Sequence, residues 1–330
     1  MNKENFDEET YQFNTVYEDE KIKIFSICGT AWTDKFQYIS KKLRKNHYIF
    51  TMDWCSTENN SHENPLQLIK NCEYPENIIF MSSVPSSHKK RIENGFNSII
   101  CNHNTFINTN IYDIKSEFKK EYNMIINSRA KEWKNIYLAK EVDNTALIVN
   151  RWNIESHWGN NSDDYLNLKY SYLNDCKLNQ IQVSEKMNQS FTGGIFSFKE
   201  GACYSSSEYL LCGIPVVSTK SLGGRDVYYN EYNSIIVEPN EMEVKYACEK
   251  LIREKKDPKE IRNSHLEITK EHENNLINEF QKIFDENDIN KKASEWFYEN
   301  KNSKWLEQPN HFMKAEGCAK KIKDIIKILN

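Results

Sequence analysis

The sequence SFKEGACYSSSEYLLCGIPVVSTKSLGGRD, residues 197–226, carries the signals of a turn, a helix and a buried strand in close succession. Residues 202–212 are expected to form a short helix that follows a glycine turn. Gly213 is placed to end this helix in a left-handed conformation, and Pro215 cannot continue it. Residues 214–219 are apolar and β-rich, which predicts a short buried strand ahead of a glycine pair. The stretch therefore predicts an α/β unit.

Two glutamates flank the start of this predicted helix. A glycine turn before a helix presents backbone N–H groups and the positive end of the helix dipole, which favours an anionic ligand. Glu200 precedes the helix, and Glu208 lies about two turns into it, where it could accept hydrogen bonds from sugar hydroxyls. In the simpler alternative, Glu200 only complements the helix dipole and Glu208 is a solvated helix residue. Neither glutamate alone decides between these interpretations.

The motifs of the whole stretch resemble the donor-binding segment of retaining glycosyltransferases of the GT4 type, the group 1 glycosyltransferases. These motifs are E-x7-E from Glu200 to Glu208, then C-G-I-P-V-V-S-T, then G-G-R-D. The resemblance implies that Glu200 acts at the donor sugar as a catalytic residue and that Glu208 holds the nucleotide ribose. The family's usual loop glycine is replaced by Cys203, which leaves the identity of the sugar open. The implied donor-sugar residues are Glu200, Gly201, Ala202, Cys203 and Tyr204.

A pair of cations lies in NSRAKEWK, residues 127–134, directly after a predicted strand. This segment resembles the G-R-x-x-x-x-K-G segment that opens the donor domain of GT4 enzymes, in which both cations contact the diphosphate. Ser128 and Asn135 stand in place of the two glycines. An arginine can bind a diphosphate bidentately and a lysine supplies a point charge, so we expect Arg129 and Lys134 to bind it. A solvated, charged helix start is the alternative.

The N-terminal part is predicted to form a Rossmann-like domain over residues 21–118, after a polar tail over residues 1–20. Strand-like runs alternate there with helical segments, which is typical of parallel α/β sheets. The motif G-x-G-x-x-G is absent, so a tightly bound dinucleotide is not indicated. The predicted strands are residues 21–28, 47–52, 77–81 and 96–101.

Ligands of open α/β sheets gather outside the carboxyl ends of the strands. Gly29 and Thr30 follow the first predicted strand, and His103 and Asn104 follow the fourth. We therefore expect Gly29, Thr30 and Asn104 on the acceptor side. His103 is a second candidate catalytic residue, and its alternative is a hydrogen bond to a loop carbonyl.

The same resemblance implies the domain boundaries in the rest of the chain. Residues 119–292 are expected to form the Rossmann-like donor domain, and residues 293–330 to form helices that pack back on the N-terminal domain. Residues 179–183 could form a strand. A loop near this point touches the nucleotide base in the family, which makes Val183 and Ser184 candidates for base binding.

Composition narrows the classes of function. The net charge of −4 argues against non-specific nucleic-acid binding. The nine cysteines form no C-x-x-C pair, which favours buried free thiols in a reducing compartment. No run approaches the roughly twenty apolar residues of a membrane span, and the polar, acidic N-terminus does not resemble a signal peptide. These features predict a cytoplasmic protein, for which peripheral membrane contact remains possible.

The sequence thus predicts an α/β protein of the GT-B type, with two Rossmann-like domains, an interdomain cleft and a C-terminal helical extension. The resemblance implies glycosyl transfer from a nucleotide-diphosphate sugar to a hydroxyl of a glycan, lipid-linked or other acceptor, with retention of anomeric configuration. No convincing D-x-D motif is present, so neither a metal nor another cofactor is expected. The alternatives are a non-catalytic subunit that binds a nucleotide sugar and another GT-B enzyme, such as a nucleotide-sugar epimerase.

Overall fold

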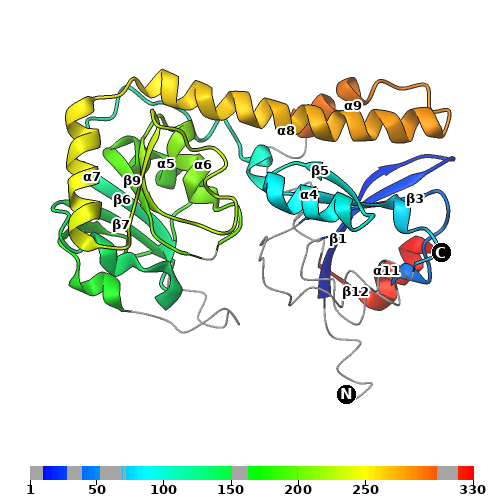
Figure 1. The fold of residues 1–330 in the computed structure, drawn as a ribbon, viewed down its shortest axis with the longest axis horizontal. Helices are drawn as coiled ribbons and strands as arrows, with labels where there is room; N and C mark the ends of the chain where they lie inside the picture. The colour runs from blue at the N-terminus through cyan, green and yellow to red at the C-terminus, as the bar shows by residue number, and fades with distance from the viewer. Residues whose placement is uncertain are drawn as a thin grey trace, which may run out of the picture. The chain divides into compact units, whose positions relative to one another are not determined.

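The computed structural model describes residues 10–27, 39–52, 69, 72–150, 163–198, 200–302 and 319–330. The chain forms two compact units, of which one comprises Met1–Asn108 with Lys270–Asn330 and the other comprises Thr109–Thr269. Each unit contains one six-stranded sheet with helices packed on it (Figure 1). The chain returns to the first unit within helix α8, Pro258–Glu286. The predicted α/β class is confirmed.

The first unit has the strand order β12-β1-β2-β3-β4-β5. Strands β2 to β5 are parallel, whereas β1 is antiparallel to both β2 and β12. The four parallel strands lie within two residues of the predicted ones. The strands are β1 Thr10–Glu18, β2 Lys23–Ile27, β3 His47–Met52, β4 Ile78–Ser82, β5 Asn97–Ile100 and β12 Ala319–Lys321.

The prediction of a polar tail was wrong for residues 10–18, which form β1. Phe13 and Tyr17 are 0% and 5% exposed and pack in two different clusters of buried side chains. Residues four apart share a face in a regular strand, but a register shift between Thr15 and Tyr17 separates these two. The irregularity hides the alternation by which a strand is recognised in a sequence.

Helices cover both faces of this sheet. The second part of α8 and helix α9, Ala293–Asn300, bury Phe280, Phe284 and Phe297 on one face. Helix α11, Ile322–Leu329, packs on the other face with Ile322, Ile325 and Leu329. The C-terminal segments therefore belong to the same unit as the first strands. Helix α4, Pro85–Glu93, and the 3-10 helices η2 (Pro75–Asn77) and η3 (His103–Phe106) complete the described part of this unit.

The second unit has a fully parallel sheet in the order β11-β10-β9-β6-β7-β8. Helix α7, Glu241–Glu254, lies on one side of it, and helices α5, Gln180–Asn188, and α6, Tyr204–Leu211, lie on the other (Figure 1). Short 3-10 helices, among them η4 (Glu132–Lys134) and η5 (Ile136–Ala139), follow β6. The strands are β6 Tyr122–Arg129, β7 Thr145–Asn150, β8 Tyr170–Leu173, β9 Ser190–Ile195, β10 Val216–Thr219 and β11 Ser234–Val237.

Residues 179–183, predicted as a strand, instead begin helix α5. The Asn179 side chain accepts a hydrogen bond from the Gln182 backbone at 3.0 Å, and the Gln182 side chain accepts one from the Asn179 backbone at 2.9 Å. This reciprocal pair is a capping box. Its N-x-x-Q pattern is the local signal that identifies the helix start.

The boundaries between the units lie at Asn108 and Thr269, whereas positions 118 and 292 were expected. Arg262 explains the first shift, because it donates hydrogen bonds to the carbonyls of Thr109 and Tyr112 at 2.9 and 2.7 Å. These bonds hold the first residues after Asn108 against the second unit.

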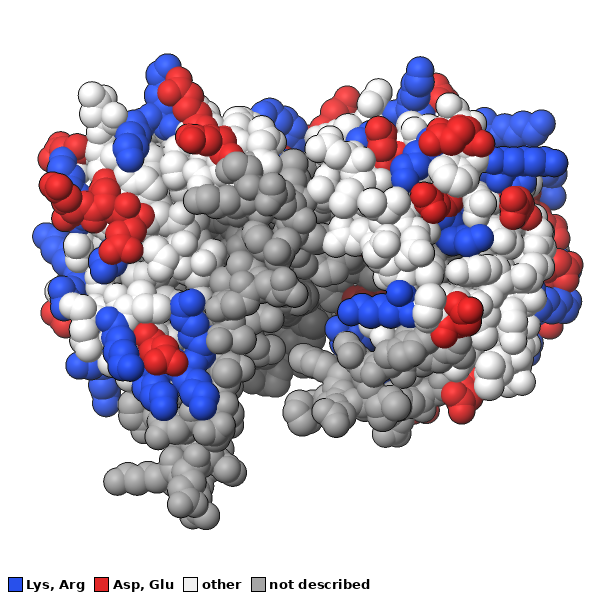
Figure 2. All heavy atoms as spheres, turned by 180° about the vertical axis from the view of Figure 1, so that it is seen from behind, with Lys and Arg blue, Asp and Glu red and all other residues white. Residues whose placement is uncertain are grey.

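No helix in the described part of the chain combines the length and the apolar content that crossing a bilayer requires. Lys and Arg side chains are interspersed with Asp and Glu side chains over the face shown in Figure 2, in keeping with the net charge of −4.

Candidate functional site

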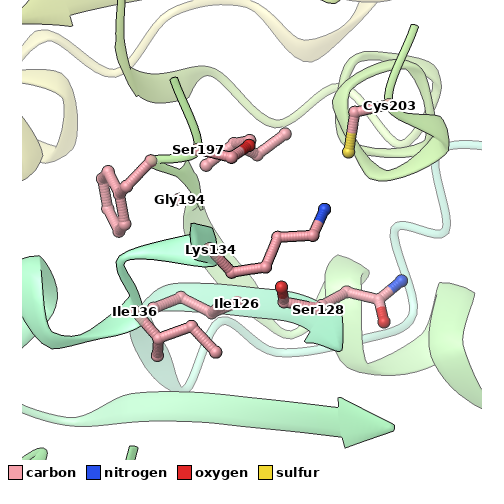
Figure 3. Close-up of a pocket in the computed structure, with 10 residues that line it drawn as sticks. Ile126, Ser128, Lys134, Ile136, Gly194, Ser197 and Cys203 are labelled. Atoms are coloured by element: carbon pink, nitrogen blue, oxygen red, sulfur yellow. The ribbon is translucent and has the colours of Figure 1, made fainter. Parts of the chain in front are cut away.

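A pocket opens in the second unit at the carboxyl ends of β6 and β9 (Figure 3). This is the edge of a parallel sheet where ligands of α/β proteins bind. The pocket brings together residues from β6, from the 3-10 helices after it, from the end of β9 and from the start of α6. Its lining residues are Ile126, Asn127, Ser128, Lys134, Ile136, Gly194, Ile195, Phe196, Ser197 and Cys203.

Lys134 extends into this pocket (Figure 3), and its amino group pairs with Glu200. Its amino group donates a hydrogen bond to Glu200 Oε1, and the two side chains are only 10% and 13% exposed. The next residue, Asn135, has a φ of +51° and donates to the Phe196 carbonyl at 3.1 Å. Asparagine tolerates the left-handed region, which is why it can replace the glycine expected there. Lys134 and Glu200, which the resemblance made candidates separately, therefore lie in one site.

The environment of Glu200 keeps its carboxyl group ionised. Burial by itself raises the pKa of Glu200, but the charge and hydrogen bond of Lys134, the hydrogen bond of Ser197 and the charge of Arg225 outweigh it. The net effect is a lowered pKa. Glu200 is thus a hydrogen-bond acceptor at neutral pH.

Arg225 is a site residue to which the sequence assigned no role. Its side chain is completely buried, and its Nη1 atom lies 3.9 Å from Glu200 Oε2. Nη1 also donates to Ser197 Oγ at 2.7 Å, and Ser197 in turn donates to Glu200 Oε2. The only available signal was its place in G-G-R-D, a motif recognised by resemblance.

Gly223 and Gly224, the two residues before Arg225, must each be glycine for a different steric reason. A Cβ atom on Gly223 would lie 1.4 Å from the Glu200 carbonyl oxygen, so only a glycine lets the two backbones pass. Gly224 has a φ of +90°, which L side chains rarely adopt. The loop is thus built against the backbone of Glu200.

Helix α6 is attached to β6 through Asn127. The backbone N–H of Asn127 donates to Tyr209 Oη at 2.7 Å, and its carbonyl accepts from Ser205 Oγ at 2.8 Å. The Asn127 side chain donates to Glu208 Oε2 at 3.2 Å. Gly213 ends the helix region with a φ of +69°, so the predicted left-handed stop is confirmed. Residues 202 and 203 precede the helix, whose N-cap is Cys203.

Glu208 sits in a different environment from Glu200. Burial raises its pKa to about 7, even though hydrogen bonds from Tyr112 and Asn127 oppose this rise. In the absence of an added donor or cation, the carboxyl group of Glu208 is thus poised to gain or lose a proton near neutral pH. Tyr112 was not predicted as a site residue, because it is far from Glu208 in the sequence.

The remaining donor-side predictions fall at several places. Cys203 lines the pocket, and burial followed by the charge of Glu200 raises the pKa of its thiol to about 11, so the thiol stays neutral. Gly201 and Ala202 are buried beside it, and Tyr204 begins α6. Arg129 ends β6 with an exposed side chain and does not line the pocket.

The other candidates lie away from the pocket. Val183 and Ser184 are buried in α5, and Ser184 donates to the Ile111 carbonyl at 2.7 Å. His103 and Asn104 belong to η3 of the first unit and are each 1% exposed, so they would have to be uncovered before touching a substrate. Gly29 and Thr30 lie outside the described residues.

No known family model matches the chain, and no curated protein matches it. Three similar solved structures are HepE of Anabaena in complex with UDP, sucrose-phosphate synthase of Thermosynechococcus elongatus, and the pneumococcal O-GlcNAc transferase GtfA in complex with UDP and GlcNAc. The identities are 14%, 10% and 12%, over 68%, 70% and 72% of this chain and 68%, 64% and 53% of those chains. The TM-scores are 0.48, 0.48 and 0.46.

Proposed function

We propose that this chain is a retaining glycosyltransferase of the GT-B type, which moves a sugar from a nucleotide-diphosphate sugar to an acceptor hydroxyl. The observation that carries this proposal is the set of charges formed by Lys134, which lines the pocket, and by Glu200 and Arg225 beside it. Lys134 and Arg225 converge on the single carboxylate of Glu200. These three groups leave one positive charge uncompensated in a largely buried site, which favours an anionic ligand.

The diphosphate of the donor is the anion that fits this arrangement best. Lys134 can turn from Glu200 toward a phosphate oxygen, because its amino group lies in the pocket. The first turn of α6, which begins after the pocket-lining residue Cys203, adds backbone N–H groups and the positive end of the helix dipole. Arg129, whose exposed side chain at the end of β6 lies outside the pocket lining, supplies a second cation.

The reaction breaks the bond between the anomeric carbon and the diphosphate oxygen, which leaves with the bonding electrons. Negative charge therefore grows on the diphosphate, where Lys134, Arg129 and the start of α6 stabilise it. The acceptor hydroxyl passes its proton to an oxygen of the departing diphosphate, and its own oxygen forms the new bond to the anomeric carbon on the side from which the diphosphate departs, which retains the configuration.

The two glutamates divide the recognition of the donor. The lowered pKa of Glu200 makes it an acceptor of hydrogen bonds from the donor sugar, and because it is ionised at neutral pH it holds no proton to give as a general acid. Glu208 accepts hydrogen bonds from the ribose hydroxyls. Lys134 and Arg129 supply the positive charge that a metal ion would otherwise provide to the departing diphosphate. We therefore propose a metal-independent reaction.

The test is an assay of nucleotide release and of sugar transfer with a panel of UDP-, GDP- and ADP-sugars, in the presence and absence of EDTA. The proposal expects release from at least one donor, no loss of rate with EDTA, and a product whose anomeric configuration, read from NMR coupling constants, is that of the donor. Glu200→Gln should lose activity and keep its nucleotide affinity. Nucleotide-sugar binding without release would refute the transferase, and release of an epimerised nucleotide sugar would reassign the reaction.

A further inference from the structure

We propose that Arg225 is a positioning residue, which keeps Glu200 ionised and correctly oriented while Lys134 is engaged with the donor diphosphate. This role rests on the proposed function and extends it to a residue that cannot itself touch the substrate. The argument begins with where the guanidinium group lies and what holds it.

The guanidinium of Arg225 is enclosed by the ends of two neighbouring strands. The side chain is 0% exposed. Its Nη2 atom donates to Ser218 Oγ at 3.1 Å and to the Thr219 carbonyl at 2.6 Å, both in β10. Its Nη1 atom donates to both the carbonyl and the hydroxyl of Ser197, just after β9. Such a side chain is fixed in place and out of reach of a ligand.

A buried guanidinium remains charged, so it needs an anion nearby. Within the described ranges, Glu200 is the acid recorded within 4 Å of it, at 3.9 Å. Ser197 bridges the two groups, because its hydroxyl accepts from Arg225 and donates to Glu200 Oε2. The bridge fixes the direction of the carboxylate as well as its charge.

The two oxygens of Glu200 therefore have different partners. Oε1 accepts from Lys134, whose amino group lies in the open pocket, whereas Oε2 faces Ser197 and the enclosed Arg225. A diphosphate can draw Lys134 away from Oε1, but nothing in the pocket can reach Arg225. Without Arg225, Glu200 would then be a largely buried carboxylate that has lost both cations recorded beside it among the described residues, and such a group takes up a proton.

The backbone of Arg225 adds a second constraint. Its carbonyl accepts from Ser206 Oγ at 2.9 Å, which joins the glycine loop to the first turn of α6. One residue thus contacts the end of β9, the end of β10, α6 and Glu200. The parts that form the pocket are set relative to one another by these contacts.

The experiment compares the wild-type enzyme with Arg225→Met and Arg225→Lys in pH–rate profiles of kcat and KM for the donor found active in the panel. Since the reaction needs an ionised Glu200, Arg225→Met should move the acid limb of the kcat profile up by about one pH unit or more. Near the wild-type limb kcat should fall about tenfold, while KM changes little. Arg225→Lys keeps the charge, so its acid limb should stay near that of the wild type, with a lower plateau because lysine lacks the planar fork.

Arg262→Met is the matched control, since Arg262 also donates to backbone carbonyls but contacts neither Glu200 nor the pocket. It should lower stability and leave the acid limb in place. If Arg225→Met does not fold, Ser197→Ala tests the role of Arg225 instead. This variant should shift the acid limb of the kcat profile in the same direction by a smaller amount. An unmoved acid limb in the folded Arg225→Met variant, or in Ser197→Ala if that variant must decide, would overturn the role of Arg225. A wild-type chain inactive with every donor would refute the proposed function itself, and the role with it.

Discussion

Gly223 and Glu200 approach each other so closely that a Cβ atom on Gly223 would lie 1.4 Å from the Glu200 carbonyl oxygen and 2.1 Å from its carbonyl carbon. Both atoms belong to backbone, so no side-chain rotation can relieve the overlap. The position of Glu200 in the pocket therefore depends on a glycine in a different loop.

Gly223→Ala should accordingly disturb the site and the fold together. We expect a loss of at least about 2 kcal/mol in the free energy of unfolding, as in overpacked interiors, and loss of transfer activity. Urea denaturation and the donor assay measure the two effects. Gly95→Ala is the comparison, because Gly95 is exposed at a φ of +80° with nothing within 4 Å. It should cost only about 1 kcal/mol and keep activity; equal effects of the two variants would contradict the steric argument.

Lys134→Met should abolish transfer and weaken binding of the nucleotide diphosphate about tenfold or more, because it removes the cation of the open side of the pocket. Its partner Glu200 is 13% exposed, so stability should also fall, by about 1–3 kcal/mol, with Arg225 limiting the loss. Calorimetric titration with UDP, GDP and ADP, together with thermal unfolding, measures both. Lys140→Met removes an exposed pair with Glu241 and should change neither. Unchanged nucleotide affinity in Lys134→Met would remove Lys134 from the donor site.

Glu208 should make the ligand-free protein less stable as the pH rises. Its pKa is about 7 in the folded chain against 4.5 for the free group, so the folded state holds a proton that the unfolded state releases between these values. Stability should fall from about pH 4.5 to pH 7, by up to about 3 kcal/mol, and level off above. Glu208→Gln should remove this contribution and be more stable than the wild type at pH 8. Urea denaturation at pH 5, 6, 7 and 8 tests the slope, and parallel curves for the two proteins would refute it.

Nucleotide affinity should depend on pH in the opposite sense to stability, and through the same residue, Glu208. Ribose hydroxyls donate to the ionised carboxylate of Glu208, so affinity should rise as the pH increases through about 7 and then reach a plateau. Binding near neutral pH should also release a proton, which titration calorimetry detects by comparing buffers of different ionisation enthalpy. Glu208→Gln should bind more weakly, without proton release. A wild-type affinity that is flat across this range would argue that the ribose lies elsewhere.

The parts predicted correctly from the sequence depend on contacts between residues close together in the chain. Gly213 ends the α6 region in the left-handed conformation, and the four parallel strands of the first unit lie where their apolar runs indicated. Two elements differ from the predictions for different reasons. A register shift after Thr15 breaks the alternation of β1, whereas the capping box at Asn179 is a regular helix signal within a segment predicted as a strand.

By itself, the sequence determined the positions of most parallel strands and the end of the α6 region, since turns, helix stops and apolar runs act over a few positions. Its resemblance to a known family also made Glu200, Glu208 and Lys134 candidate site residues, and the structure brings Lys134 against Glu200. Only the tertiary structure decided the partners: Ser197 meets Arg225 across 28 residues, and Asn127 meets Glu208 across 81. Such hydrogen bonds and the opposite pKa shifts of the two glutamates arise from burial and neighbouring charges, which exist only once the strands have packed into a sheet.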